Sequence, residues 1–379
     1  MSDAASMSDI DIKLMSRALK LALQGDPSPN PHAAAVLAQG EKPLAEGFHQ
    51  AAGTEHAEVA AIRQAGATAR GSTMYVTLEP CNHEGRTPPC VDAILAAGVR
   101  RVVVGCRDPN PNVRGGGIER LQEAGVEVEL GVLEAEAKEL VRPWTKFVTT
   151  GTSHLALKLA LSLDGRIATR TGISKWITCN ESRARVHALR AYHDAVMIGV
   201  NSVITDDPQL TVRDVPGRNP IRVVIDSKLR TPVSSQLASR AREVPTCVVT
   251  TVDGSRAAAE ALESAGVSIL RVPATAEGRC DMIATLRELA AREVVSVLCE
   301  GGAELAGSLL ANGLADELHA FIAPVLLGPR GRPAAVDWAG PENLAEAPRI
   351  EPPRWELCGT TAYVWGPLLY PKRARATTA

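Results

Sequence analysis

Short apolar strands alternate with helical segments along most of the chain, and this alternation limits the possible folds more than any other feature. Apolar residues recur at helical spacing over residues 11–23, whereas residues 73–78 and 101–105 are compact runs typical of buried strands. Strands that alternate with helices favour layered α/β domains. We therefore predict an α/β protein, with one helix over 133–147 closing its first third.

The pattern restarts after a small polar stretch at residues 149–153, which indicates a domain boundary. Beyond it, residues 154–161 and 221–225 begin a second series of predicted strands. The 379 residues are enough for two to three domains of ordinary size. We predict two domains, over residues 8–148 and 152–370, followed by a basic polar tail.

The charge balance and the cysteine usage exclude several classes of protein. Lys plus Arg is 41 and Asp plus Glu is 43, which argues against a broad basic surface for nucleic acid. No apolar run approaches the ~20 residues of a membrane span, and the polar N-terminus lacks a signal-peptide core. Eight scattered cysteines without a secretion signal indicate a reduced, cytoplasmic protein, in which clustered cysteines are first candidates for metal binding or catalysis.

The strongest chemical signal combines Thr54-Glu-His-Ala-Glu58 with two proline-preceded cysteines, Cys81 and Cys90. His56 and these cysteines suit Zn²⁺, and three protein ligands with an open fourth position are typical of a catalytic zinc. Such a zinc would lower the pKa of bound water to ~7, and Glu58 would shuttle the proton. The His-x-Glu and Pro-Cys elements are those of zinc-dependent deaminases, although eight residues, not two, separate the cysteines here.

Other interpretations of these residues remain open at this point. Cys81 and Cys90 could form a disulfide or be two unrelated thiols. His83, in the loop between them, could close a purely structural zinc site as a fourth ligand.

The motifs as a set closely resemble the family of bifunctional riboflavin-biosynthesis deaminase/reductases, over nearly the whole chain. The long loop Gly85-Arg-Thr-Pro-Pro-Cys90 is distinctive of that family and accounts for the wide cysteine spacing. The remaining matching motifs are His49-Gln-Ala-Ala-Gly-Thr-Glu-His-Ala-Glu58, Glu79-Pro-Cys81, Asp108-Pro-Asn-Pro111, Leu157-Lys-Leu-Ala-Leu-Ser-Leu-Asp-Gly-Arg166, Ser174-Lys-Trp-Ile-Thr178, Asp206-Asp-Pro-Gln-Leu-Thr-Val-Arg213, Val224-Ile-Asp-Ser227 and Glu300-Gly-Gly302.

The resemblance implies two domains, two cofactors and two consecutive reactions. A cytidine-deaminase-like α/β/α sandwich with one Zn²⁺ would hydrolyse the amino group at C2 of 2,5-diamino-6-(5-phosphoribosylamino)pyrimidin-4(3H)-one. A dihydrofolate-reductase-like α/β domain would then use NADPH to reduce the ribosyl group to ribityl. The partners implied are this small-molecule substrate and further copies of the chain, since the family usually forms dimers or tetramers.

For the deaminase, the resemblance assigns substrate binding to four polar residues, and Arg86 could meet the substrate phosphate. The four are Asn30, His49, Asp108 and Asn110. The two asparagines could instead serve turns beside proline, and Arg86 could be a solvated loop residue. One departure concerns Ala33 and Ala34, which stand where the family usually has Val-Gly; a backbone conformation that only glycine adopts easily would be strained at Ala34, close to Asn30.

For the reductase, no Gly-x-Gly-x-x-Gly opens a Rossmann unit, so a dinucleotide site must be built differently. A Gly301-Gly302 turn before a predicted helix could let backbone N–H groups approach phosphate, or could be a tight turn alone. The resemblance assigns NADPH binding to Ala160, Trp176, Ser202, Asp206, Ser227 and Gly302. It assigns reductase substrate binding to Lys158, Ser174, Arg190, Leu210, Arg213 and Glu300. The two arginines suit a sugar phosphate, because guanidinium binds phosphate through a bidentate fork.

Two other functions remain open from the residues alone. The chain could be a nucleoside or base deaminase with an appended NADPH-binding module of unrelated activity. It could also be a catalytically inactive, zinc-stabilised regulatory protein, although Glu58 and the open zinc position argue against this.

Overall fold

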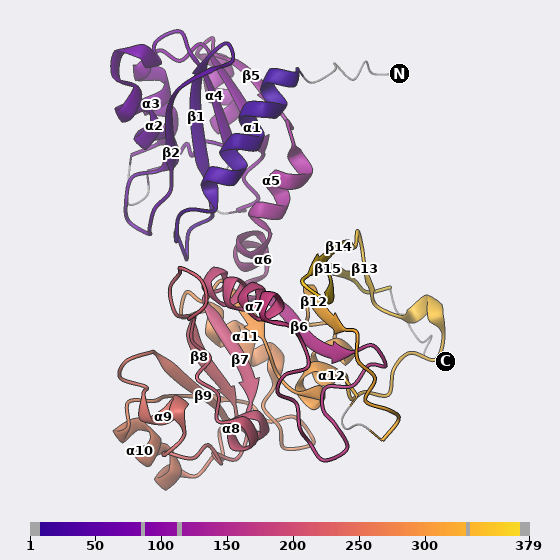
Figure 1. Cartoon of the computed structure of the whole chain (residues 1–379). Coiled ribbons are helices and arrows are strands. Elements are labelled where there is room, and N and C mark those ends of the chain that lie inside the picture. Colours follow the sequence, from indigo (N-terminus) through magenta and orange to yellow (C-terminus); the bar gives the residue numbers. More distant parts are fainter. Residues whose placement is uncertain (1–7, 85–87, 112–115, 331–333, 372–379) are drawn as a thin grey trace, which may run out of the picture. The chain divides into compact units, whose positions relative to one another are not determined.

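A computed structural model describes residues 8–84, 88–111, 116–330 and 334–371 of the chain (Figure 1). The chain divides into two compact units between Gly151 and Thr152. Each unit is an α/β structure built on one sheet. No helix in the described part of the chain combines the length and the apolar character needed to cross a lipid bilayer.

The first unit has a five-stranded sheet in the order β2-β1-β3-β4-β5. β1 pairs antiparallel with β2 and β3, whereas β3, β4 and β5 run parallel. The strands are β1 (Ala34–Gln39), β2 (Lys42–Phe48), β3 (Thr73–Leu78), β4 (Arg101–Cys106) and β5 (Glu127–Leu130). The helices are α1 (Asp9–Ala22), α2 (Ala57–Ala65), α3 (Cys90–Ala97), α4 (Gly117–Glu123), α5 (Glu134–Leu140) and α6 (Arg142–Thr150), with a 3-10 turn at Gly66–Ala69.

Helices cover both faces of this sheet, as an α/β/α sandwich requires. One face packs against α2, α3 and α4 through an apolar cluster that includes Ala61, Ile94 and Leu121. The other face packs against α1 through a second cluster that includes Leu14 and Val103. Because aromatic residues are only 3% of the chain, small and branched aliphatic side chains fill these layers.

The single helix predicted over 133–147 is wrong, because the segment forms two helices that break at Val141. Val141 closes α5 with a non-helical backbone and also precedes the first residue of α6. Pro143 follows in the first turn of α6, where its missing N–H costs nothing; inside one continuous helix it would have removed a hydrogen bond.

The second unit has a ten-stranded sheet in the order β10-β9-β8-β7-β11-β6-β12-β15-β13, with β14 also paired to β15. The seven strands from β10 to β12 run parallel, and β15 is antiparallel to β12. The strands are β6 (His154–Ser162), β7 (Ala195–Gly199), β8 (Ile221–Ile225), β9 (Thr246–Thr251), β10 (Ser268–Val272), β11 (Ser296–Cys299), β12 (Glu317–Ala323), β13 (Arg349–Ile350), β14 (Arg354–Cys358) and β15 (Thr361–Leu369). The helices are α7 (Asn180–Tyr192), α8 (Val200–Asp206), α9 (Gln236–Ser239), α10 (Arg256–Ser264), α11 (Met282–Ala290) and α12 (Ala303–Ala311), with a 3-10 turn at Leu344–Glu346.

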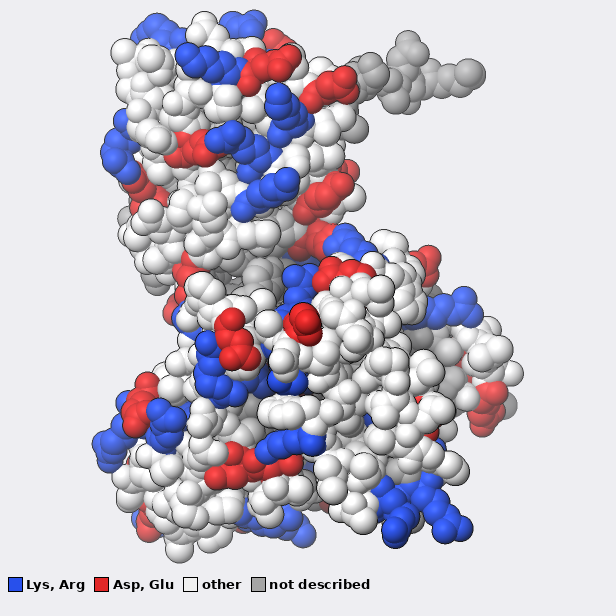
Figure 2. Space-filling view, in the orientation of Figure 1, with Lys and Arg blue, Asp and Glu red and all other residues white. Residues whose placement is uncertain are grey.

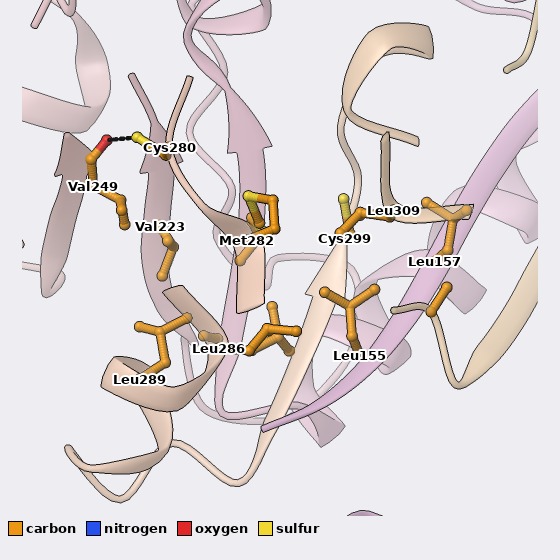
Figure 3. Close-up of a cluster of buried hydrophobic side chains, with 14 of the residues drawn as sticks. Leu155, Leu157, Val223, Val249, Cys280, Met282, Leu286, Leu289, Cys299 and Leu309 are labelled. Carbon is orange, nitrogen blue, oxygen red and sulfur yellow. Dashed lines mark hydrogen bonds between the residues drawn. The ribbon is translucent and has the colours of Figure 1, made fainter. Parts of the chain in front are cut away.

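Both faces of the second sheet are also buried, which suits its parallel strands. Figure 3 shows the cluster on one face, where Leu286 of α11 and Leu309 of α12 meet Leu155, Val223 and neighbouring strand residues. The opposite face packs against α8, α9 and α10 through another cluster. The carboxyl ends of the parallel strands lie along one edge, where ligands usually bind in such sheets.

Charged side chains are mixed in sign on the surface of both units. On the face shown in Figure 2, Lys and Arg are interspersed with Asp and Glu. This agrees with the near-zero net charge of −2.

Candidate active sites

Three candidate metal-donor atoms meet in the first unit, on His56, Cys81 and Cys90. Their nitrogen and sulfur atoms all lie within 4.8 Å of one another. His56 Nδ1 is 3.2 Å from Cys90 Sγ and 3.6 Å from Cys81 Sγ. Both cysteines are free thiols, so the disulfide alternative is wrong in this structure, and His83 is exposed.

Two helix starts and one loop bring these donors together. His56 is the N-cap of α2, Cys90 is the first residue of α3, and Cys81 follows β3 in a loop. The positive ends of helices favour thiolate ligands at such places. The close packing depends on Gly47, because a Cβ there would lie 2.2 Å from the carbonyl oxygen of Ala57, and β2 could not approach α2 so closely.

The donor set fits a tetrahedral zinc. With Zn–S of ~2.3 Å and Zn–N of ~2.05 Å, a sulfur and a nitrogen ligand stand about 3.6 Å apart, close to the separations found here. A hydrogen bond from Cys90 holds the pKa of the Cys81 thiol far below its usual range, at about 4, while the pKa of Cys90 is raised because it keeps the shared proton. A cation would replace that proton, since coordinated thiols are deprotonated.

Glu58 lies beside this group, in the first turn of α2, and only 7% of its surface is exposed. Burial raises the pKa of its carboxyl group. A carboxylate in a site shielded from bulk water is suited to accept and return a proton. The sequence placed Glu58 two residues after His56, and the structure brings it next to the ligand group without making it one of the three donors.

Two of the predicted pyrimidine-binding residues form one polar group with the three candidate metal ligands. Asn30 Nδ2 lies 2.9 Å from His49 Nε2, and the other ring nitrogen of His49 lies 3.2 Å from the carbonyl oxygen of Glu55. The rings of His49 and His56 meet edge to face with their centroids 5.2 Å apart. The structure therefore links Asn30 to the ligand group through His49.

The other two residues of the predicted substrate group sit in one loop after β4. The carboxylate of Asp108 accepts the backbone N–H of Asn110 at 2.8 Å, and burial raises the pKa of Asp108. Glu79 is buried beside this loop, and its supporting role was not predicted from the sequence. Its carboxylate accepts backbone N–H groups from Asp108 and Ile118. Arg86 lies outside the described residues.

Ala34 has ordinary extended backbone at the start of β1, so its replacement of glycine causes no local strain. Its backbone N–H donates to Thr77 Oγ1 at 3.1 Å. Replacement of glycine by Ala34 therefore does not strain the backbone at this position.

In the second unit, Lys158, Arg190 and Glu300 form a largely buried ionic triad. Glu300 Oε1 accepts from Arg190 Nε at 2.5 Å, and Lys158 Nζ lies 3.6 Å from Glu300 Oε2. Burial alone would raise the pKa of Glu300, but the two cations outweigh burial and bring it to about 2. Burial also lowers the pKa of Lys158. These residues come from β6, α7 and the segment after β11, far apart in sequence.

Two more of the predicted substrate residues, Leu210 and Arg213, share a loop with Thr211 that contacts the triad. Arg190 Nη1 donates to the carbonyl oxygen of Thr211 at 3.1 Å. Leu210 is buried and adopts a left-handed backbone with φ of 55°. No role is predicted for Thr211 or His187 from the sequence, although His187 stands one helical turn before Arg190, a spacing that places both on one face of α7.

Several residues predicted for NADPH follow the carboxyl ends of the parallel strands. Gly302 caps α12 after β11, and a Cβ built on it would lie 3.8 Å from Ser202 Oγ of α8. Ser227 follows β8, and its hydroxyl accepts the backbone N–H of Cys280 at 2.9 Å. Asp206 ends α8, and Ala160 lies near the end of β6.

Ser174 and Trp176 lie together in the segment between β6 and α7. Ser174 is half-buried, whereas Trp176 is 69% exposed and lies under the guanidinium of Arg183, 4.5 Å from the ring centroid. Lys175 Nζ donates to the carbonyl oxygen of Asp206 at 3.2 Å, which ties this segment to the end of α8.

Comparisons with known proteins match both units. The model of the cytidine and deoxycytidylate deaminase zinc-binding region matches residues 8–106, and the model of the RibD C-terminal domain matches residues 153–364. Riboflavin biosynthesis protein RibD of Aquifex aeolicus is 43% identical over 323 residues, which are 84% of this chain and 88% of that protein. The Escherichia coli protein of the same name is 42% identical over 352 residues, 89% of this chain and 94% of that protein.

Solved structures agree with these relatives. RibD of Acinetobacter baumannii, form 1, aligns with a TM-score of 0.83 and 37% identity over 95% of this chain and 99% of that chain. A diaminohydroxyphosphoribosylaminopyrimidine deaminase/5-amino-6-(5-phosphoribosylamino)uracil reductase from Thermotoga maritima aligns with a TM-score of 0.82 and 34% identity, with the same coverage. The predicted α/β fold class, a deaminase-like sandwich followed by a reductase domain, is confirmed.

These matches span both units, so they do not favour either a base deaminase with an unrelated module or an inactive regulatory protein. The chain belongs to the RibD family of bifunctional riboflavin-biosynthesis enzymes, in which a deaminase is joined to a reductase.

Proposed function

We propose that this chain deaminates 2,5-diamino-6-(5-phosphoribosylamino)pyrimidin-4(3H)-one in a zinc-dependent step and then reduces the ribosyl group of the product to ribityl with NADPH. The observation that carries the proposal is the meeting of His56, Cys81 and Cys90 beside the buried carboxylate of Glu58. One histidine and two cysteine ligands with a neighbouring glutamate are the set that zinc-dependent hydrolytic deamination uses.

In the first unit, His56, Cys81 and Cys90 would hold the zinc. When bound, zinc supplies a nucleophilic hydroxide at neutral pH by lowering the pKa of water. Glu58 takes the proton released from the water on its carboxylate and gives it to the departing amino nitrogen, which leaves as ammonia. The low exposure of Glu58 supports this role, because few solvent molecules can compete for the proton.

Polar residues around the ligand group would orient the pyrimidine. His49, in hydrogen-bond distance of Asn30, offers one side of this site, and Asp108 with Asn110 offers another. A heteroaromatic ring with several donors and acceptors needs matched polar partners once it is desolvated. Arg86 is proposed for the substrate phosphate on the basis of family resemblance alone.

In the second unit, bound NADPH would supply the hydride, and the protein would position the dinucleotide and the ribosyl carbon. Ala160, Trp176, Ser202, Asp206, Ser227 and Gly302 are proposed for the dinucleotide. Their support is that strand ends and the N-terminus of α12 gather along one edge of the sheet.

The sugar phosphate would lie against the ionic triad and the loop that carries Arg213. Lys158, with Glu300, would hydrogen-bond the ribosyl hydroxyl groups, and Arg190 and Arg213 would supply positive charge for the phosphate. Ser174 and Leu210 complete the proposed substrate group.

We also propose that the chain forms a homo-oligomer through the exposed edge of the second sheet. β14 pairs with β15, and its side chains Trp355 and Leu357 are 65% and 77% exposed. Two large exposed apolar side chains on one face of an edge strand are typical of a surface that another chain covers. Sedimentation of the wild type and of Leu357→Glu should show the variant dissociating at concentrations where the wild type is associated; identical behaviour would contradict this interface.

The eight free cysteines support a reducing, cytoplasmic location.

Removal of zinc separates the two proposed activities. Chelation of the full chain should abolish ammonia release, but NADPH oxidation with the deaminated intermediate as substrate should continue. Metal analysis of the same samples should show ammonia release rising in proportion to bound zinc on readdition. Deamination that persists in metal-free protein would contradict the zinc mechanism, and ammonia release from cytidine instead of the diaminopyrimidine would favour a nucleoside deaminase.

A further inference from the structure

The guanidinium of Arg213 is held from one side only. Its Nη1 donates to Gln209 Oε1 at 3.0 Å and to Thr211 Oγ1 at 2.9 Å, which uses both hydrogens of that nitrogen. The N–H groups of Nε and Nη2 have no partner within the described residues, and Arg213 forms no ion pair there. Arg213 is exposed, so this free edge can receive an external anion such as a phosphate.

The backbone of Arg213 is held by a buried histidine. His187 is 5% exposed on α7, and its Nδ1 accepts the backbone N–H of Arg213 at 3.1 Å. Because Nδ1 is an acceptor, the ring hydrogen must be on Nε2. Nε2 lies 3.4 Å from Asp214 Oδ2, so the carboxylate of the next residue favours this tautomer. The loop thus contacts both nitrogens of the imidazole, and the ring fixes the path of the loop.

A chain of two side-chain amides holds the guanidinium itself. Gln236 Nε2 donates to the carbonyl oxygen of Asp207 at 2.6 Å, which turns Gln236 Oε1 toward Gln209. Gln209 Nε2 donates to that oxygen at 2.8 Å, and this leaves Gln209 Oε1 to accept from Arg213. The order of donors and acceptors is therefore determined along the whole chain from α9 to the guanidinium.

We propose that His187 is a positioning residue of the reductase, which, with the Gln236–Gln209 amide chain, holds Arg213 so that the free edge of its guanidinium meets the substrate phosphate. The inference rests on the proposed phosphate-binding role of Arg213. His187 acts through Arg213 and does not itself touch the substrate. Because Arg213 is already ordered in the folded protein, its side chain loses less conformational entropy when the substrate binds.

Two substitutions in the full chain separate positioning from a general structural role. His187→Leu removes the acceptor, whereas His187→Asn keeps one, because Asn Oδ1 stands at the same number of bonds from Cβ as His Nδ1. With 5-amino-6-(5-phosphoribosylamino)uracil as substrate, His187→Leu should raise KM by about 2- to 10-fold, the value of one lost hydrogen bond. Its kcat and its KM for NADPH should stay unchanged, and His187→Asn should restore KM to within about twofold of the wild type.

The same substrate without its phosphate supplies the decisive control. Wild type and His187→Leu should have the same KM for this analogue, because the arginine then has no anion to bind. An unchanged KM for the phosphorylated substrate in His187→Leu, an equal effect on the analogue, or no rescue by Asn would overturn the proposal.

Arg213→Ala distinguishes failure of this inference from failure of the proposed function. If Arg213→Ala raises KM by at least about 10-fold, as loss of a charge-assisted contact predicts, while His187→Leu has no effect, only the positioning role is wrong. If Arg213→Ala itself leaves KM unchanged, the phosphate assignment fails, and the role of His187 fails with it. Arg256→Ala is the matched control, since Arg256 is 90% exposed on α10 and pairs only with Glu260 in the described part of the chain.

Discussion

Replacement of Glu58 by glutamine tests the proton-transfer step of the deaminase most sharply. The amide has nearly the same shape, so it should still fit its buried position in the first turn of α2. It cannot accept the proton from water or return it to the leaving nitrogen. A positioned general acid/base contributes about 10²- to 10⁴-fold to rate, equivalent to about 3 to 5 kcal/mol of activation free energy.

The burial of Glu58 sets the expected loss toward the upper part of that range. With 7% exposure, the site gives bulk water little opportunity to replace the carboxylate as proton carrier. We expect kcat for ammonia release to fall by at least about 10³-fold. Because burial raises the pKa of Glu58, its negative charge does not stabilise the fold, so a neutral amide at this position should leave the variant folded.

The assay measures initial rates of ammonia release at saturating diaminopyrimidine, together with zinc content. Glu58→Gln should keep its zinc and should oxidise NADPH normally with the deaminated intermediate. Glu55→Gln is the matched control, because Glu55 lies one residue before His56 and its carboxylate pairs with Arg63 at 2.5 Å. A zinc-loaded Glu58→Gln enzyme that deaminates within tenfold of the wild-type rate would refute the role assigned to Glu58.

Three further predictions concern stability. Glu300→Gln leaves the buried cations of Lys158 and Arg190 without their anion and should lower the free energy of unfolding by about 3 kcal/mol or more; an unchanged Tm would contradict this. Burial lowers the pKa of His319 to about 3, so as pH falls below ~6.5 the unfolded chain binds the proton first and stability decreases. Between pH 7 and pH 5, His319→Gln should therefore lose about 2 kcal/mol less stability than the wild type in urea unfolding, and equal losses would count against a buried neutral imidazole. Ala34→Gly, which restores the glycine usual in this family, should destabilise β1 by about 0.5 to 1 kcal/mol, whereas a gain in stability would indicate hidden strain at Ala34.

Much of the fold follows from apolar periodicity, and its exceptions have local causes. The strands β3 and β8 agree with the predicted ranges 73–78 and 221–225 residue for residue, because each is a short apolar run with abrupt ends. The helix α8 was missed, since Val200-Asn-Ser-Val-Ile-Thr-Asp206 is rich in residues that disfavour helices. Its place directly after β7, against the apolar cluster on that face, overrides this preference.

The sequence predicted site residues by chemical type and motif, but it did not predict the contacts that support them. The three candidate ligands could be selected from the sequence because few residue types bind zinc and each stands beside proline or a helix start. The support of Arg213 was not predictable in this way. Its partner His187 is 26 residues away, and Gln209 is 27 residues from Gln236, so these groups meet only because α7 and α9 each contact the loop that carries Gln209 and Arg213.

The most direct test of the two-step account is a single reaction that records ammonia release and NADPH oxidation on the same preparation of the full chain. Starting from the diaminopyrimidine, the account predicts that ammonia appears first, that NADPH oxidation follows after a lag, and that both reach the same final amount. Oxidation of NADPH without prior ammonia release, or ammonia release with no NADPH oxidation, would contradict it.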